Sequence, residues 1–289
     1  MPGFPELDGP PFAIFSGENL LNVIAYTATC ATGTPVSGHA ASNVLTTKIY
    51  NTWTTPAAGP HTLRLTDPGF GRSANVFVIA SPAGRPMVGD VTMIVRNFVG
   101  SIVLSETLPN LAVDGLPDRR FLFVDDSVTV KHLDLICASG SEIGRVFIGE
   151  SIDLTGLTRD DWKTAIHSLG RVQFGGSIGT WSVRDQQERP RRAKATSCGI
   201  KAGFLHQILP LKRAFLANGK LGEVVWLPRA AEPTDSVGLI EMMHRTGIYG
   251  RYSAPLRIRR GDTRVVASGF LAGETLRTFD LSTEFKDFY

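Results

Sequence analysis

The chain has 289 residues, about two domains at the usual size of about 100–200 residues each. Hydrophobic residues make up 43% and charged residues 20%, which excludes an intrinsically disordered chain. The net charge of +3 is unevenly distributed. Residues 1–150 carry 9 lysines and arginines against 13 acidic residues, and residues 151–289 carry 21 against 14. Net charges of −4 and +7 predict two units with different surroundings.

Residues 1–150 contain short β-forming runs separated by turn residues. The expected strands span residues 20–29, 50–54, 61–66, 75–80, 91–96, 101–104, 121–125, 129–136 and 145–148. Residues 61–66 and 129–136 alternate apolar with polar, as half-buried strands do, and only residues 40–45 look helical. Because turns recur about every 8–12 residues with no helical period between them, the sequence predicts an antiparallel jelly-roll sandwich over residues 1–150, in a chain that is mainly β.

Residues 151–289 predict a β-rich α+β module. Its expected strands span residues 171–174, 179–184, 222–227, 252–259, 264–270 and 275–279. Thr158 would cap a short helix over residues 157–167. An apolar stripe at helical spacing predicts a longer helix over residues 203–218, kinked at Pro210. The polar and basic residues 186–194 are expected to form a loop.

One motif resembles a catalytic element. Residues 175–179 match the G-x-S-x-G pattern of the serine-hydrolase nucleophile elbow, with Ser177 as nucleophile, and Asp235 and His244 follow in the required order. An elbow needs a strand before the serine and a helix after it, whereas residues 179–184 have the pattern of a strand. A glycine-rich hairpin turn accounts for the motif. We therefore predict that the protein is not an enzyme and keep a serine hydrolase using Ser177 as a minor alternative.

Other site chemistry has little support in the sequence, and we predict no catalytic, cofactor-binding or metal-binding residues. None of the six histidines is paired at metal-ligand spacing. The pairs Asp125–Asp126 and Asp160–Asp161 are typical of solvated or helix-capping aspartates. The basic run over residues 188–194 lacks interleaved aromatic residues, so nucleic acid is not expected as a partner. The histidines are His39, His61, His132, His167, His206 and His244.

The sequence also bears on the compartment. Cys30, Cys137 and Cys198 are far apart and odd in number, which favours reduced thiols over a disulfide framework. The N-terminal residues have no basic region followed by a long apolar run, so no signal peptide is expected. No apolar stretch approaches the ~18–20 residues of a membrane span. We expect a protein that is made in the cytosol, stays soluble or joins an assembly there, and does not insert into membranes.

Four short segments resemble a known family. They are the turn Ala41–Leu45, Trp53 just ahead of the alternating strand at residues 61–66, the strand at residues 74–80, and residues 143–149. The first three are similar to discoidin-like (galactose-binding-like) jelly rolls, in particular those built into bacteriophage tail proteins. The last resembles the segment that closes such a domain in tail-tip proteins. The loop at residues 67–71 is longer than the turn usual in these domains.

This resemblance implies a virion structural protein of a tailed bacteriophage, of the distal tail or baseplate. Such a protein would link the tail tube to the tip or baseplate through protein–protein contacts and use no cofactor. It would be assembled in the host cytoplasm and lie in the tail as a homo-oligomeric ring. The opposite charges of the two halves suit head-to-tail contacts. Arginine outnumbers lysine 22 to 8, a bias typical of protein interfaces.

The main alternative is a carbohydrate-binding module that recognises the host surface, with a host glycan as partner. Its site would lie in the loops of the jelly roll. Tyr50, Trp53 or Phe70 would then form an exposed stacking platform for a sugar. Trp53 lies in the middle of an expected strand, so core packing explains it equally well.

Overall fold

The structure is a computed structural model of the chain. It describes residues 12–16, 18–56, 58–82, 84–110 and 117–153, and beyond them residues 163–166, 172–175, 180–183, 191–201, 223–229, 247–252, 257–265 and 275–287. Every pair of strands among these residues is antiparallel. The described chain is mainly β, as the sequence predicts.

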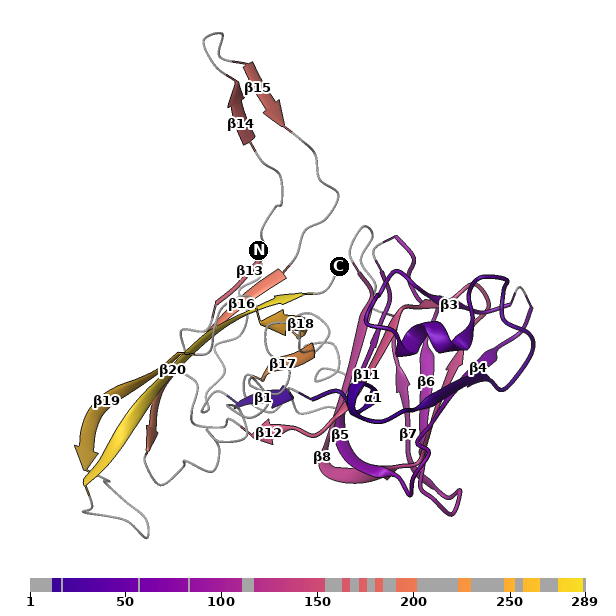
Figure 1. Cartoon of the computed structure of the whole chain (residues 1–289), viewed down its shortest axis with the longest axis horizontal. Coiled ribbons are helices and arrows are strands. Elements are labelled where there is room, and N and C mark those ends of the chain that lie inside the picture. Colours follow the sequence, from indigo (N-terminus) through magenta and orange to yellow (C-terminus); the bar gives the residue numbers. More distant parts are fainter. Residues whose placement is uncertain are drawn as a thin grey trace.

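Two facing sheets form a jelly-roll sandwich, drawn from indigo to magenta in Figure 1. One sheet has the order β2-β4-β9-β6-β7 and the other the order β11-β5-β8. Neighbouring strands are mostly not consecutive in sequence, which is the mark of jelly-roll connections. The strands of the first sheet are β2 (Thr27–Cys30), β4 (His61–Thr66), β6 (Val91–Arg96), β7 (Ile102–Leu108) and β9 (His132–Cys137); those of the second are β5 (Arg72–Ala80), β8 (Arg119–Val130) and β11 (Arg145–Gly149). A short pair, β3 (Trp53–Thr54) with β10 (Glu142–Ile143), completes the sandwich.

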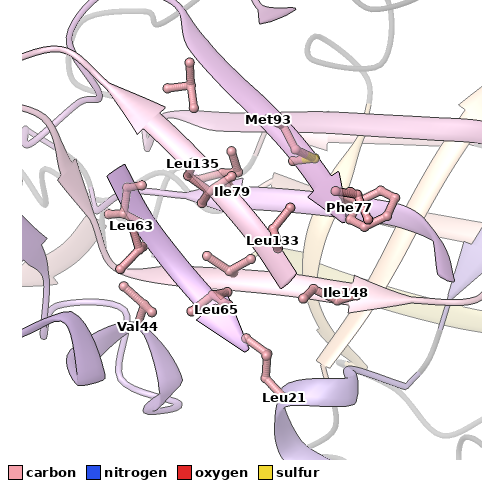
Figure 2. Packing of buried hydrophobic residues seen from close by; sticks show 14 of the residues in the cluster. Leu21, Val44, Leu63, Leu65, Phe77, Ile79, Met93, Leu133, Leu135 and Ile148 are labelled. Atoms are coloured by element: carbon pink, nitrogen blue, oxygen red, sulfur yellow. The ribbon is translucent and has the colours of Figure 1, made fainter. Parts of the chain in front are cut away.

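The core lies between these two sheets. β4 and β6 alternate buried and half-buried residues along their whole length, because successive side chains of a strand point to opposite faces. Figure 2 shows Leu63 and Leu65 of β4 and Leu133 of β9 facing Phe77 of β5 and Ile148 of β11. Each of these side chains is fully buried, and such burial stabilises a fold by about 1.5–3 kcal/mol per residue.

The expected strands of the first half differ in places from the observed ones. The strand expected over residues 129–136 is divided, since its first two residues end β8 and β9 begins at His132. Residues 20–23 form helix α1 (Leu20–Val23) where a strand over residues 20–29 was predicted, so that part of the prediction is wrong. Asn19 explains the difference, since its side chain accepts a hydrogen bond from the Leu21 amide and caps the helix. The helix-like turn predicted at residues 40–45 is confirmed as the 3-10 helix η1 (Ala41–Leu45).

The second half is built around a larger antiparallel sheet, with the order β12-β1-β17-β18-β20-β16-β13 and with β19 also paired to β20. Its strands are β1 (Phe12–Ser16), β12 (Ile152–Asp153), β13 (Lys163–Ile166), β16 (Arg191–Lys201), β17 (Glu223–Arg229), β18 (Ile248–Tyr252), β19 (Arg257–Val265) and β20 (Thr275–Asp287). A separate hairpin consists of β14 (Val172–Gly175) and β15 (Thr180–Val183). β1 falls within the unit predicted at residues 1–150 but is hydrogen-bonded to β12 and β17 of this sheet.

Two predictions in the second half are wrong. β13 occupies part of the helix expected at residues 157–167, and β16 begins inside the loop expected at residues 186–194. Both strands are held by pairing with distant parts of the chain, β13 with β16 and β16 with β20, and such pairing overrides local propensity. The helix expected at residues 203–218 lies outside the described residues.

Candidate functional site

The outer faces of β11 and β5 are not open to solvent. All five residues of β11 and the last seven of β5 are buried, so both faces of these strands are covered. One face lines the jelly-roll core. On the other face, Val78 and Phe147 belong to a second apolar cluster with Val225 of β17 and Tyr249 of β18. The rings of Phe147 and Tyr249 meet edge to face, with centroids 5.8 Å apart. The larger sheet therefore covers the outer face of the jelly roll.

A buried ion pair crosses this junction. Arg145 of β11 donates from Nε to Oε1 of Glu223 at 2.8 Å, and the two side chains are 2% and 3% exposed. The same guanidinium donates to the carbonyl oxygen of Val44 at 3.1 Å and to Oδ1 of Asn22. Three acceptors thus surround one buried cation, which is what a guanidinium needs away from water.

Glu223 is satisfied from both modules. Its Oε2 accepts from the Tyr249 hydroxyl at 3.1 Å and from the side-chain amide of Asn19. Burial disfavours the charged guanidinium of Arg145, but Tyr249 and Glu223 outweigh that effect and raise the pKa of Arg145 above its ordinary value. Burial, followed by the charge of Glu223, raises the pKa of Tyr249 well above its usual range. Arg145 is therefore a cation, and the neutral hydroxyl of Tyr249 donates to Glu223.

A polar cluster lies at the end of the jelly roll where β4 begins and β9 ends. His39 Nδ1 lies 3.0 Å from the hydroxyl of Thr52 and 2.9 Å from that of Thr54. Thr52 donates its hydroxyl hydrogen to Oε2 of Glu142 at 2.8 Å, and Arg85 Nη1 lies 3.7 Å from the same oxygen. Because Thr52 has given its hydrogen to Glu142, it can only accept from His39, so Nδ1 carries the imidazole hydrogen. We call these five residues the His39 cluster.

The His39 cluster offers chemistry suited to a polyhydroxylated ligand. It combines an imidazole, hydroxyls, a carboxylate and a half-exposed guanidinium within one loop region. Tyr50, two residues before Thr52, has 54% of its surface exposed and supplies an aromatic ring at this end. No local pattern in the sequence predicts the cluster, since Arg85 and Glu142 are distant from one another in the chain.

An aromatic pair lies at the opposite end, where β4 ends. Phe70 is 85% exposed and Phe98, in the β6–β7 turn, is 62% exposed. Their rings meet edge to face with centroids 6.4 Å apart. Lys131 holds the loop before Phe70, because its Nζ donates to the carbonyl oxygens of Asp67 at 2.5 Å and Gly69 at 2.6 Å. Two exposed rings are therefore held at this end by an ordered loop and a tight turn.

Of the three residues predicted for an aromatic platform, two are exposed and one is buried. Trp53 is fully buried in the core, which agrees with its position in a strand and excludes it from a surface platform. Tyr50 and Phe70 are exposed at opposite ends of the sandwich and do not form one surface. Phe98, which pairs with Phe70, was missed by the sequence reasoning. The Phe98-Val99-Gly100 tip after an alternating strand was the available signal.

The serine-hydrolase motif does not have the structural context of an elbow. β14 and β15 pair as an antiparallel hairpin with Gly175 opposite Thr180, so a strand and not a helix follows the motif. Ser177, Asp235 and His244 lie outside the described residues. Whether the chain has enzyme activity stays a prediction.

The remaining predicted residues take ordinary places. Asp125 and Asp126 are exposed on β8, whereas Asp160 and Asp161 lie outside the described residues. Of the histidines described, His61 contacts two carbonyl oxygens and His132 contacts Thr66. Among the described residues, no group of three or more His, Cys, Asp or Glu is placed to hold a metal ion. In the same part of the chain, no helix is long and apolar enough to span a membrane.

The geometry defines the first half as an antiparallel jelly-roll sandwich. No family model matches the chain, and no curated protein matches it. Solved structures with a similar fold are carbohydrate-binding modules. One is the family 32 module of NanJ from Clostridium perfringens in complex with galactose, at 14% identity and a TM-score of 0.38, covering 47% of this chain and 99% of that chain.

Two other solved structures are similar to the same extent. A mutant of the lectin-binding domain of lectinolysin, complexed with Lewis b, has 9% identity and a TM-score of 0.39, covering 46% of this chain and 96% of that chain. Chitosan-binding module 1 of a Paenibacillus chitosanase/glucanase has 17% identity and a TM-score of 0.35, covering 45% of this chain and 98% of that chain. These are similarities of fold alone.

Proposed function

We propose that this chain is an architectural protein of a tailed bacteriophage, which links tail tube and tip or baseplate proteins through protein–protein contacts. The observation that carries the architectural part is the junction between the two halves. The phage assignment rests on the resemblance of residues 41–45, Trp53, 74–80 and 143–149 to tail-protein jelly rolls.

The junction supports a fixed body. The sheet β11-β5-β8 gives its outer face to the larger sheet, and Arg145 and Glu223 cross the interface as a buried pair. Modules joined by a small polar interface are free to move relative to one another. Here an apolar cluster and a buried charge pair fix one orientation, since any rotation would separate two buried opposite charges. A protein that positions its neighbours in a particle needs that property.

The hairpin β14–β15 supports contact with other subunits. Within the described strands, β14 and β15 pair only with each other, and Figure 1 shows the hairpin standing apart from the larger sheet. The register pairs Val172 with Val183 and Phe174 with Trp181. An isolated two-stranded hairpin is marginally stable in water. A hairpin with apolar register pairs of this kind is suited to packing on a neighbouring subunit.

Assembly is tested by size and by composition. Multi-angle light scattering on the purified full chain should give the mass of a defined oligomer. Mass spectrometry of purified tail particles should detect peptides of this chain. The double variant Phe174→Ser with Trp181→Ser should lose the oligomer while its circular dichroism is unchanged. The matched control changes the neighbouring register pair, Gln173→Ala with Ser182→Ala, and should assemble normally. A chain that stays monomeric and is missing from tail particles would disprove the proposal.

A second candidate function is glycan binding by the jelly roll. The observation that favours it is the His39 cluster beside the exposed ring of Tyr50. The solved modules of similar fold were crystallised with galactose and Lewis b, but the cluster itself carries this candidate. A glycan array with the full chain tests it. Binding should fall at least about tenfold in Tyr50→Ala, the loss of one aromatic contact, and an array with no binding would rule it out.

A further inference from the structure

A cationic group lies on the outer face of the five-stranded sheet. β4, β9 and β6 are adjacent, and their register aligns Arg64 with Asp134 and His132 with Arg96. Arg64 donates to both oxygens of Asp134, from Nε at 2.6 Å and from Nη2 at 2.8 Å. Arg96 donates from Nε to the same carboxylate at 3.3 Å. One carboxylate thus stands between two guanidinium groups.

The carboxylate is buried while the guanidinium groups are accessible. The Asp134 side chain is 4% exposed, against 38% for Arg64 and 30% for Arg96. Burial opposes ionisation of Asp134, but the hydrogen bonds and charges of the two arginines outweigh it and lower the pKa of that carboxyl. Asp134 is therefore ionised and already hydrogen-bonded to both arginines. Two guanidinium groups with one carboxylate leave a net positive charge, and the guanidinium groups are the accessible part. The fixed carboxylate also holds both guanidinium groups in place, which lowers the entropy cost of binding.

The aromatic pair adjoins this group. Phe98 follows Arg96 by two residues, and Arg96 Nη1 donates to the carbonyl oxygen of Gly100 in the same turn at 3.2 Å. Lys131 links the two regions. Its backbone amide donates to the carbonyl oxygen of Arg96 at 2.9 Å, and its Nζ holds the loop that precedes Phe70. We call Arg64, Arg96, Phe70 and Phe98 the Arg96 corner. It joins accessible cations to exposed rings at one edge of the jelly roll.

Charge identifies what this corner would bind. Residues 1–150 have a net charge of −4, so the accessible arginine pair is a positive site on a module that is negative as a whole. A long polyanion such as nucleic acid would meet the surrounding negative charge, whereas a ligand with one anionic group would not. Guanidinium groups form paired hydrogen bonds with carboxylate or sulfate oxygens. Burying an exposed ring against the C–H face of a sugar removes apolar area from water.

We propose that the Arg96 corner binds an acidic saccharide, one that bears a carboxylate or a sulfate group. The anionic group lies on Arg64 and Arg96, and a sugar ring packs on Phe70 and Phe98. This site is separate from the His39 cluster, which lies at the other end of the sandwich, and it does not depend on the proposed role in assembly.

The test is a calorimetric titration of the full chain with three probes, namely 3′-sialyllactose, lactose 6′-sulfate and lactose. At least one acidic probe should bind at least about tenfold more tightly than lactose, and whichever binds identifies the anionic group. Arg96→Gln and Phe98→Ala should each weaken that binding at least about fivefold. Lys48→Gln removes an exposed charge elsewhere on the jelly roll and should leave it unchanged. Arg96→Lys, which keeps the charge without the fork, should fall between.

Several outcomes would overturn the proposal. With the wild-type chain, these are equal affinity for lactose and the acidic probes, no binding of any probe, or tighter binding of oligo-dT than of either acidic probe. With the variants, they are an equal loss of affinity in the Lys48 and Arg96 variants, or an unchanged affinity in Phe98→Ala. The midpoints of urea unfolding confirm that each variant is folded. If Arg96→Gln does not fold, Phe98→Ala still tests the site, because it changes an exposed residue. Light scattering and Tyr50→Ala report separately on assembly and on the His39 cluster.

Discussion

The junction between the two halves makes a stability prediction that the contacts allow us to work out. Arg145→Met keeps most of the side-chain length and removes the cation, so Glu223 is left charged and buried. Breaking a buried pair by removing one partner costs about 3–5 kcal/mol. Glu223 retains the Asn19 amide and the Tyr249 hydroxyl, which limits the cost, but Val44 O and Asn22 Oδ1 lose a donor, about 1 kcal/mol each. We expect the free energy of unfolding to fall by about 4 kcal/mol.

Urea unfolding followed by far-ultraviolet circular dichroism and tryptophan fluorescence measures this change. Glu223→Gln should cost a similar amount, and the double variant should cost less than the sum of the two, with a coupling energy of at least about 2 kcal/mol. Arg85→Met is the surface control, because both members of its pair with Glu142 are accessible to solvent and the pair should contribute at most about 1 kcal/mol. The reasoning fails if Arg145→Met costs no more than the control, or if the two junction effects simply add.

Three further predictions concern the jelly roll. Gly144→Ala would place a Cβ 2.0 Å from the carbonyl oxygen of Ile49, so unfolding in urea should show a loss of at least about 2 kcal/mol, and a loss below about 1 kcal/mol would contradict the packing. The lowered pKa of Asp134 means that its contribution is complete above about pH 4 and is lost as pH falls through the folded pKa. The stability difference between wild type and Asp134→Asn should therefore shrink from about pH 5 to about pH 2; a constant difference would refute this. Burial raises the pKa of Cys137 to about 12, so with the other two cysteines replaced by serine, its reaction with a disulfide reagent at about pH 8 should require unfolding. Rapid reaction of the native protein would contradict that.

The sequence predicted the elements whose signal is local. β4 follows from alternation within six residues, because one buried face imposes a period of two, and the alternating residues 129–136 contain most of β9. β13 and β16 could not be found in this way, since their pairing partners lie far along the chain. The jelly roll was therefore predictable in outline, and the strands of the second sheet only in part.

The site residues show the same limit. Phe70 was recognised as a candidate by residue type, but its contact with Phe98 depends on two turns that meet in space. Arg64, Asp134 and Arg96 lie on three different strands and meet only through strand register. A sequence gives the residue types of such a group, whereas the alignment of strands gives the group itself.

The pairing of β1 with β12 has an evolutionary consequence. Phe15 is the register partner of Ile152, so the chain leaves the larger sheet and returns to it on adjacent strands, about 5 Å apart. Everything between them, residues 17–151, is in effect a cassette whose two ends meet at one point of a host sheet. Insertions with close ends are well tolerated. Recombination could exchange this cassette for another surface domain while β1, β12 and the rest of the host sheet keep their pairing.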